Sequence, residues 1–160
     1  MAENVRLNLD EVSVLHICYK IEKTYAELYR YFSNIHLNNP QISKLWGKTA
    51  VEEDNHADQF KMASRLLGSG IQSLKINVNE ANAVLTEVQS TYEKVQKSPP
   101  SINEALLLAI NLESSLSNYH MDSISNFGDM NFAKLFTSMM SSDQDHIQSL
   151  KKAYNNLPLR

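Results

Sequence analysis

The chain has 160 residues and a mass of 18.2 kDa, a size that suits one domain with a substantial core. Fifteen Lys and Arg residues against 18 Asp and Glu residues leave a net charge of −3, so the basic excess typical of nucleic-acid-binding proteins is absent. Its 42% hydrophobic and 21% charged residues are close to globular averages, which excludes a disordered or fibrous chain. We therefore expect residues 1–160 to form a single domain.

Cysteine content and apolar runs narrow the setting in which the protein works. The one cysteine, Cys18, cannot form a disulfide or a paired-cysteine metal site within the chain. Residues 1–11 are acidic and polar, unlike the apolar stretch of a secretory signal. No apolar run approaches the roughly 20 residues needed to span a bilayer. We expect a cytoplasmic protein that binds neither nucleic acid nor membrane.

The spacing of apolar residues predicts helices throughout. Between the Gly and Pro residues, apolar side chains recur every three or four positions, which is the period of a helix. The one short candidate for a strand, residues 71–78, alternates too loosely to be assigned. The sequence therefore predicts an all-α protein, with five helices at 8–34, 40–67, 80–97, 101–126 and 131–155.

Capping residues and loop lengths suggest how these helices are connected. Asn39 and Pro40 suit the N-cap and first residue of the second helix, and Ser101 with Glu104 suits a capping box at the start of the fourth. The short loops within each pair of long helices predict antiparallel neighbours. The long connection 68–100, which carries its own short helix, predicts a crossover between two helical hairpins. We expect an antiparallel four-helix bundle.

Each of the four long helices has one carboxylate in its otherwise apolar stripe. In two of these helices a histidine follows three residues later, on the same helix face. The six residues are Glu22, Glu53, His56, Glu113, Asp143 and His146. We take all six as candidate metal ligands and catalytic residues.

Two further glutamates lie near these positions in sequence but on other helix faces. Glu27 falls among lysine, threonine and arginine residues. Glu52 falls on a face with Lys48, Asn55 and Gln59. We expect both glutamates to be exposed, so that replacing either with alanine leaves the site intact.

The buried carboxylates require a counter-charge. An unpaired buried carboxylate costs several kcal/mol, and four converging carboxylates would be very hard to fold around. Two divalent cations carry +4 and neutralise them, while each histidine supplies one nitrogen ligand. Ferritin-like di-iron and di-manganese proteins use this pattern, with a Glu from each of two helices and a Glu-x-x-His from each of the others.

The ligand spacing is repeated along the chain. Glu22 precedes Glu53 by 31 residues, and Glu113 precedes Asp143 by 30. A shift of 90 residues also superposes His56 on His146. The two hairpins therefore present their candidate ligands in matching positions.

The segments 21–23 and 26–29, followed by Glu53-x-x-His56-Ala57, resemble the rubrerythrin branch of the ferritin-like family. The resemblance covers about residues 10–67 and 101–155. It implies a left-handed four-helix bundle with a non-haem centre of two iron ions, although manganese and zinc suit the same ligands. It also implies that Glu53 and, provisionally, Asp143 bridge the two metals, and that Glu22 and Glu113 are terminal ligands.

Three features depart from the family pattern. Asp143 stands where the family has Glu, and Leu116 stands where rubrerythrins carry a second, mobile Glu. Because Asp is one methylene shorter, we expect Asp143 to bind one metal, the ion also held by His146, or to bridge with strain. The rubredoxin module is missing, so electrons must come from a separate donor such as a rubredoxin.

Three further polar residues of the helix stripes are expected to support the ligands. Tyr29 lies seven residues after Glu22, a feature also familiar from the family, and His120 lies seven after Glu113. We expect both to hydrogen-bond ligands, as second-sphere partners, and we expect the Tyr25 hydroxyl to do the same from the core.

These observations predict an oxidoreductase that reduces hydrogen peroxide, or oxygen, to water. An iron-oxidising storage protein of the ferritin type is the alternative, and a metal-free helical interaction module is a third hypothesis from another class. We also expect the chain to form a homodimer. The sequence leaves the native metal, the oxidant and the electron donor open.

Overall fold

The computed structural model describes residues 9–65, 71–74, 77–127 and 130–158, with side chains described except at 9, 71–74, 118–127, 130–133, 135 and 136. These residues form five helices: α1 (Leu9–Ile35), α2 (Pro40–Arg65), α3 (Val78–Lys97), α4 (Ile102–Ser123) and α5 (Met130–Asn155). The prediction of five helices is confirmed. Among the described helices, none combines the length and apolar character needed to cross a membrane.

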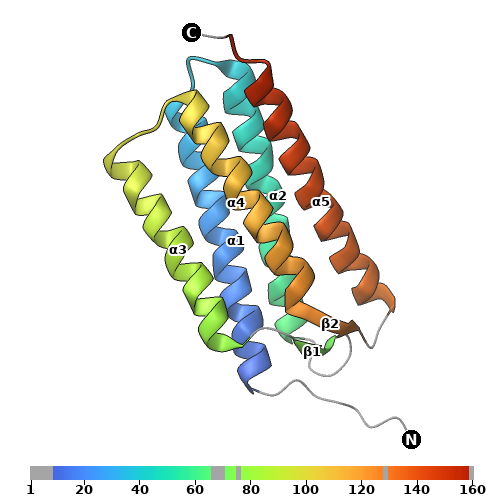
Figure 1. Ribbon diagram of the computed structural model, residues 1–160. Helices are drawn as coiled ribbons and strands as arrows, with labels where there is room; N and C mark the ends of the chain where they lie inside the picture. The colour runs from blue at the N-terminus through green and yellow to red at the C-terminus, as the bar shows by residue number, and fades with distance from the viewer. Residues whose placement is uncertain (1–8, 66–70, 75–76, 128–129, 159–160) are drawn as a thin grey trace, which may run out of the picture.

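The helices form a bundle of α1, α2, α4 and α5, and α3 lies outside it (Figure 1). α1 packs against α2 and α3, α4 packs against α5, and α2 also contacts α5. The chain runs down α2, returns to the upper end through α3, and then runs down α4 and up α5 (Figure 1). α2 and α5 are therefore antiparallel neighbours.

The helix starts follow the capping residues. Asn39 accepts a hydrogen bond from the backbone N–H of Ile42 at 3.2 Å, as an N-cap does. Ser101 and Glu104 form the predicted capping box, with the Glu104 N–H donating to the Ser101 hydroxyl at 3.3 Å and the Ser101 N–H donating to the Glu104 carboxylate at 2.8 Å. Asn77 starts α3 in the same way, so this helix begins two residues earlier than predicted.

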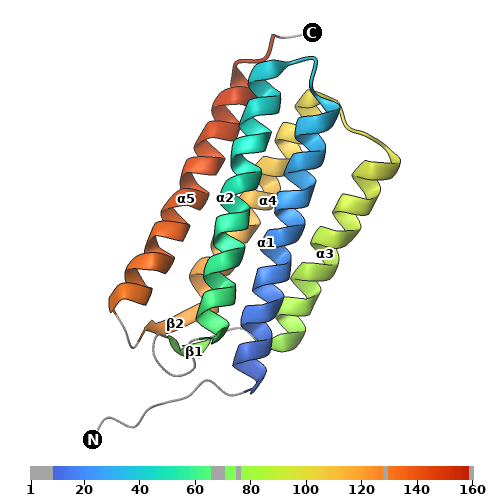
Figure 2. The same ribbon diagram turned by 180° about the vertical axis from the view of Figure 1, so that it is seen from behind.

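Two short strands were missed. β1 (Ile71–Leu74) pairs with β2 (Ile124–Phe127) in an antiparallel sheet at the lower end of the bundle (Figure 2). The prediction of helices alone was therefore wrong at these residues, and α4 ends at Ser123 because the strand follows. Pairing between segments about 50 residues apart leaves no periodic signal in either segment.

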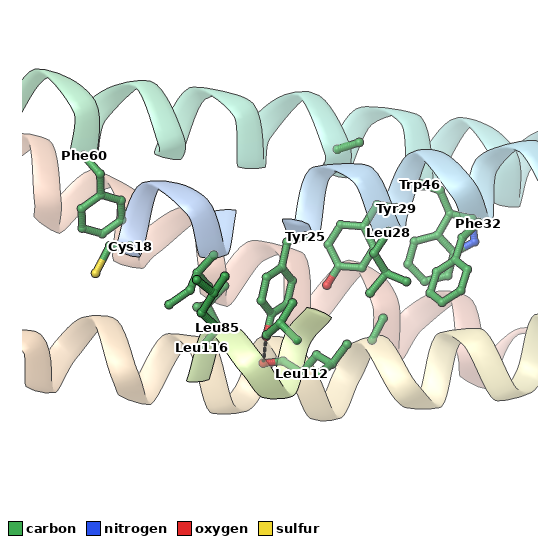
Figure 3. Close-up of a cluster of buried hydrophobic side chains, with 14 of the residues drawn as sticks. Cys18, Tyr25, Leu28, Tyr29, Phe32, Trp46, Phe60, Leu85, Leu112 and Leu116 are labelled. Carbon is green, nitrogen blue, oxygen red and sulfur yellow. Dashed lines mark hydrogen bonds between the residues drawn. The ribbon is translucent and has the colours of Figure 1, made fainter. Parts of the chain in front are cut away.

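Aromatic side chains fill the core between α1, α2 and α4 (Figure 3). Trp46, the one tryptophan of the chain, stacks on Tyr29 with ring centroids 5.5 Å apart and contacts Phe32 at 5.1 Å. Cys18 is buried in the same core (Figure 3). This packing fixes the rotation of α1 about its axis and turns Glu22, on the same stripe, toward the bundle centre.

Candidate metal centre

The structure brings the six candidate ligands of the sequence together inside the bundle. On each helix, core side chains lie one turn before and one turn after the candidate ligand. Their exposed fractions lie between 0 and 4%: Glu22 on α1, Glu53 and His56 on α2, Glu113 on α4, and Asp143 and His146 on α5. Carboxylates are almost never fully buried without partners, so this cluster requires a physical explanation.

Glu22, Glu53 and His56 form one group, which we call the His56 cluster. Their ligand atoms lie within 4.8 Å of one another, a spacing that suits a single metal ion. Nδ1 of His56 is 3.1 Å from Oε2 of Glu53 and 3.9 Å from Oε2 of Glu22. This ring nitrogen therefore faces the carboxylates and is the candidate ligand atom.

Glu53, Glu113 and His146 form the second group, the His146 cluster, within the same distance limit. Nδ1 of His146 is 2.9 Å from Oε1 of Glu53 and 3.7 Å from Oε2 of Glu113. The two imidazole rings lie 5.9 Å apart, with 29° between their planes. Glu53 thus directs one oxygen to each histidine, a geometry that suits the bridging role predicted for it.

Asp143 lies beside the histidine of α2. Its Oδ1 is 3.7 Å from Nδ1 of His56, so we associate it with the His56 cluster, whereas the sequence analysis paired it with His146. The antiparallel directions of α2 and α5 explain this placement. The two helices run in opposite directions (Figure 1), so His56, three residues after Glu53, meets Asp143, three residues before His146.

The tyrosines differ in what they contact. Tyr29 donates a hydrogen bond to Oε1 of Glu113 at 2.5 Å, as predicted for a residue that supports a ligand. Tyr25 instead donates to the backbone carbonyl of Leu112 at 3.3 Å (Figure 3). His120 belongs to α4, but its side chain lies outside the described residues.

Glu52 is a functional candidate that the sequence analysis placed wrongly. We expected it to be exposed, but its carboxylate hydrogen-bonds Nε2 of His146 across the α2–α5 contact, and its side chain is 32% exposed. A residue next to the inward Glu53 is turned by about 100° around the helix, and here that direction faces α5. Only the identity of the neighbouring helix could have revealed the contact. Glu27 is exposed as expected.

The carboxylates shift the pKa values of both histidines upward. Burial alone would lower the pKa of His146, but the contacts with Glu113 and Glu53 raise it to about 11. The pKa of His56 is also raised, because Glu53, Glu22 and Asp143 outweigh its burial. Burial and the negative charge of Glu53 raise the pKa of Glu113 to about 7. The site therefore attracts positive charge strongly.

The donor atoms fit a metal centre. Among the described residues, Oε1 of Glu53, Oε2 of Glu113 and Nδ1 of His146 are buried without a hydrogen bond of good geometry, although Nδ1 lies within 3.7 Å of both oxygens. Atoms that converge on a common point but do not bond one another are arranged as a cation would arrange them. Carboxylate and imidazole donors together suit iron, manganese or zinc.

A cleft between α2 and α5 reaches the edge of the site. Its volume is about 160 Å³, enough for a few small molecules. It is lined by Glu52, Asn55, His56, Gln59, Ser138, Met139 and Ser142. Most of these side chains carry hydrogen-bonding groups, so the cleft gives water or a small polar substrate a route to His56.

Comparisons with known proteins found no matching family model, no matching curated protein and no matching solved structure.

Proposed function

We propose that this protein is a rubrerythrin-like, non-haem di-iron oxidoreductase that reduces hydrogen peroxide to water. The observation that carries the proposal is the pair of buried clusters that share Glu53. Four carboxylates, Glu22, Glu53, Glu113 and Asp143, carry −4 when ionised, and two Fe(II) ions carry +4. The loaded site is then neutral, which removes the cost of burying the carboxylates.

A ferritin-like topology is part of this proposal. The α1–α2 hairpin, the crossover through α3 and the α4–α5 hairpin follow the chain order of a bundle with one long connection (Figure 1). Leu116 is fully buried in the core, where the rubrerythrin pattern has a second glutamate. The ligand set that we propose accordingly consists of the six residues above.

The bound iron pair would supply two electrons for cleavage of the peroxide O–O bond. The residues of the chain supply the rest. Glu53 would contribute a carboxylate oxygen to each of the two ions, while Tyr29 holds the carboxylate of Glu113 in a fixed orientation. The small cleft admits peroxide and the two protons that its reduction to two water molecules consumes, and it excludes larger substrates. The two electrons would be replaced by a separate electron donor.

Anaerobic titration with Fe(II) tests the proposal. We expect two ions per chain by metal analysis. We also expect a change in the fluorescence of Trp46, because it stacks on Tyr29, which hydrogen-bonds the candidate ligand Glu113. Addition of peroxide should then produce the near-ultraviolet absorption of an oxidised iron pair, faster than oxygen does. Less than one ion per chain, unaltered by His56→Ala, would contradict the metal site.

A matched control and the alternative outcomes sharpen this experiment. Asp58→Ala removes one exposed acid from the same helix as His56 and should keep both ions. Faster oxidation by oxygen, together with iron retained in large particles, would favour the ferritin-type storage protein. A protein that binds no metal but keeps its fold would favour the interaction module.

A further inference from the structure

The imidazole of His146 is contacted on both of its nitrogen atoms. Nδ1 faces Glu53 and Glu113 inside the bundle, and Nε2 hydrogen-bonds the carboxylate of Glu52 on α2. Ser142, one turn earlier on α5, lies 3.4 Å from the same Nε2. The orientation of this ring is therefore set by a second helix as well as by its own.

The chemistry of this contact fixes which nitrogen is available to a metal. A neutral imidazole has one N–H and one lone pair, and an ionised carboxylate can only accept a hydrogen bond. Glu52 therefore places the N–H of His146 on Nε2 and leaves the lone pair on Nδ1, directed at Glu53 and Glu113. A carboxylate that accepts a hydrogen bond from the non-coordinating nitrogen of a ligand histidine also makes the coordinating nitrogen more basic.

His56 lacks an equivalent contact. Within the described part of the chain, its hydrogen bond is the one between Nδ1 and Glu53, and nothing hydrogen-bonds its Nε2. His56 instead lines the cleft between α2 and α5. The effect of Glu52 is thus confined to one of the two clusters.

The surroundings of Glu52 allow this role without disturbing the core. Its second carboxylate oxygen is 3.8 Å from Nζ of Lys48, one turn earlier on α2, which offsets the added negative charge. Its partial exposure at the cleft means that a smaller side chain there leaves no buried cavity. Substitutions at this position can therefore be tested in a folded protein.

We propose that Glu52 is a positioning residue that orients His146 and fixes its tautomer, so that the His146 cluster binds its metal ion more tightly. The inference rests on the metal site of the proposed function, but not on the peroxide reaction.

Cobalt(II) alone is a suitable probe, since its visible spectrum reports nitrogen coordination and its affinity can be measured by competition with a chelator. In Glu52→Ala we expect one of the two ions to bind roughly 10–100-fold more weakly. Glu52→Gln should lose less Co(II) affinity than Glu52→Ala, because its amide oxygen still accepts a hydrogen bond from Nε2. Asp58→Ala, the charge-matched control on α2, should bind Co(II) like the wild type. After removal of metal by a chelator, all variants should have melting temperatures close to that of the metal-free wild type.

A double-variant cycle separates positioning from a general effect of charge. If Glu52 acts through His146, then Glu52→Ala should add no further loss to His146→Ala. Failure of the wild type to bind two Co(II) ions would overturn the proposed metal site itself. Three results would overturn the role of Glu52 alone. Both ions could bind tightly in the wild type and in Glu52→Ala, or Glu52→Ala could weaken both ions equally. Alternatively, Glu52→Ala could cause a further loss of Co(II) affinity in the His146→Ala background.

Discussion

The His56 cluster and the His146 cluster share Glu53 but differ in how their remaining ligands are held. On the His56 side, Asp143 adds a carboxylate next to the ring, and the ring itself borders the cleft. On the His146 side, Tyr29 contacts Glu113 and Glu52 contacts the ring.

The difference shows that two sequence repeats can give two inequivalent candidate metal positions. The His56 side has more negative charge close to its candidate ion, whereas the His146 side has more hydrogen bonds that fix its ligands. Charge favours binding of any cation, while fixed ligands favour one geometry. We therefore expect the two ions to differ in exchange rate and in affinity, and the following variants test this difference.

The largest effect is expected from Glu53, because both clusters need it. Glu53→Ala removes one oxygen from each cluster and leaves Nδ1 of His56 and Nδ1 of His146 without the carboxylate nearest to them. We expect the stoichiometry to fall from two ions per chain to less than one, as measured by metal analysis after dialysis. Glu27→Ala, an exposed glutamate on α1, is the control and should retain both ions. Retention of both ions by Glu53→Ala would remove the basis for a shared site.

Asp143 should affect one ion. Because its carboxylate lies near His56, Asp143→Ala should weaken the ion of the His56 cluster and leave the other in place. Chelator competition with Co(II) is expected to show one unchanged and one weakened dissociation constant. The longer side chain of Asp143→Glu should reach further into the site and tighten the weaker ion. The assignment would be reversed if Asp143→Ala gave no further loss when combined with His146→Ala, but did so with His56→Ala.

The gain in stability from metal should increase with pH. In the folded, metal-free protein the pKa of His146 is about 11, against 6.5 for an ordinary histidine. Protonation of His146 therefore stabilises the metal-free fold fully below pH 6.5, and this contribution is lost as the pH rises toward 11. Metal binding requires the neutral ring, so the apparent affinity should rise by roughly tenfold per pH unit for each proton displaced. We expect the difference in melting temperature between the loaded and chelated protein to grow from pH 6.5 to pH 9. A difference that shrinks over this interval would contradict the proton–metal exchange.

The smallest effect is expected from Tyr29→Phe. This change keeps the ring that stacks on Trp46 and removes only the hydrogen bond to Glu113, which should cost about 1.5 kcal/mol in free energy of unfolding. Urea denaturation measures this loss, and the ion of the His146 cluster should bind a few-fold more weakly. Tyr25→Phe is the matched control, because the hydrogen bond it removes, to the carbonyl of Leu112, is long and involves no ligand. Equal effects of the two variants on metal affinity would argue against a role for Tyr29.

Much of the fold could be predicted from local signals. The helical period and the caps at Asn39 and Ser101 place the helix starts within one or two residues. The polar residues that interrupt the apolar stripes were correctly predicted to be buried, since a helix face follows directly from residue spacing. This information is contained within each helix, so a single sequence is enough to predict the helices and their buried faces.

The rest depends on contacts between elements distant in the chain. Glu52 has a polar environment on its own helix, and only the position of α5 turns it toward His146. The pairing of Asp143 with His56 follows from the antiparallel directions of α2 and α5, and would have been available from the predicted topology. The β1–β2 sheet joins segments whose local patterns are weak, so neither strand could be assigned alone.

The ligands are divided between the two helical hairpins, and this division has a consequence for the order of assembly. The three members of the His56 cluster come from α1 and α2, which a short turn connects, so these three residues need only nearby contacts to come together and should do so early in folding, before α5 adds Asp143. The His146 cluster is complete only after α3 has carried the chain back and the second hairpin has docked. An ion captured early by α1 and α2 would therefore offer the arriving α4–α5 hairpin a template, and metal present during refolding should accelerate docking of the hairpins more than formation of the helices.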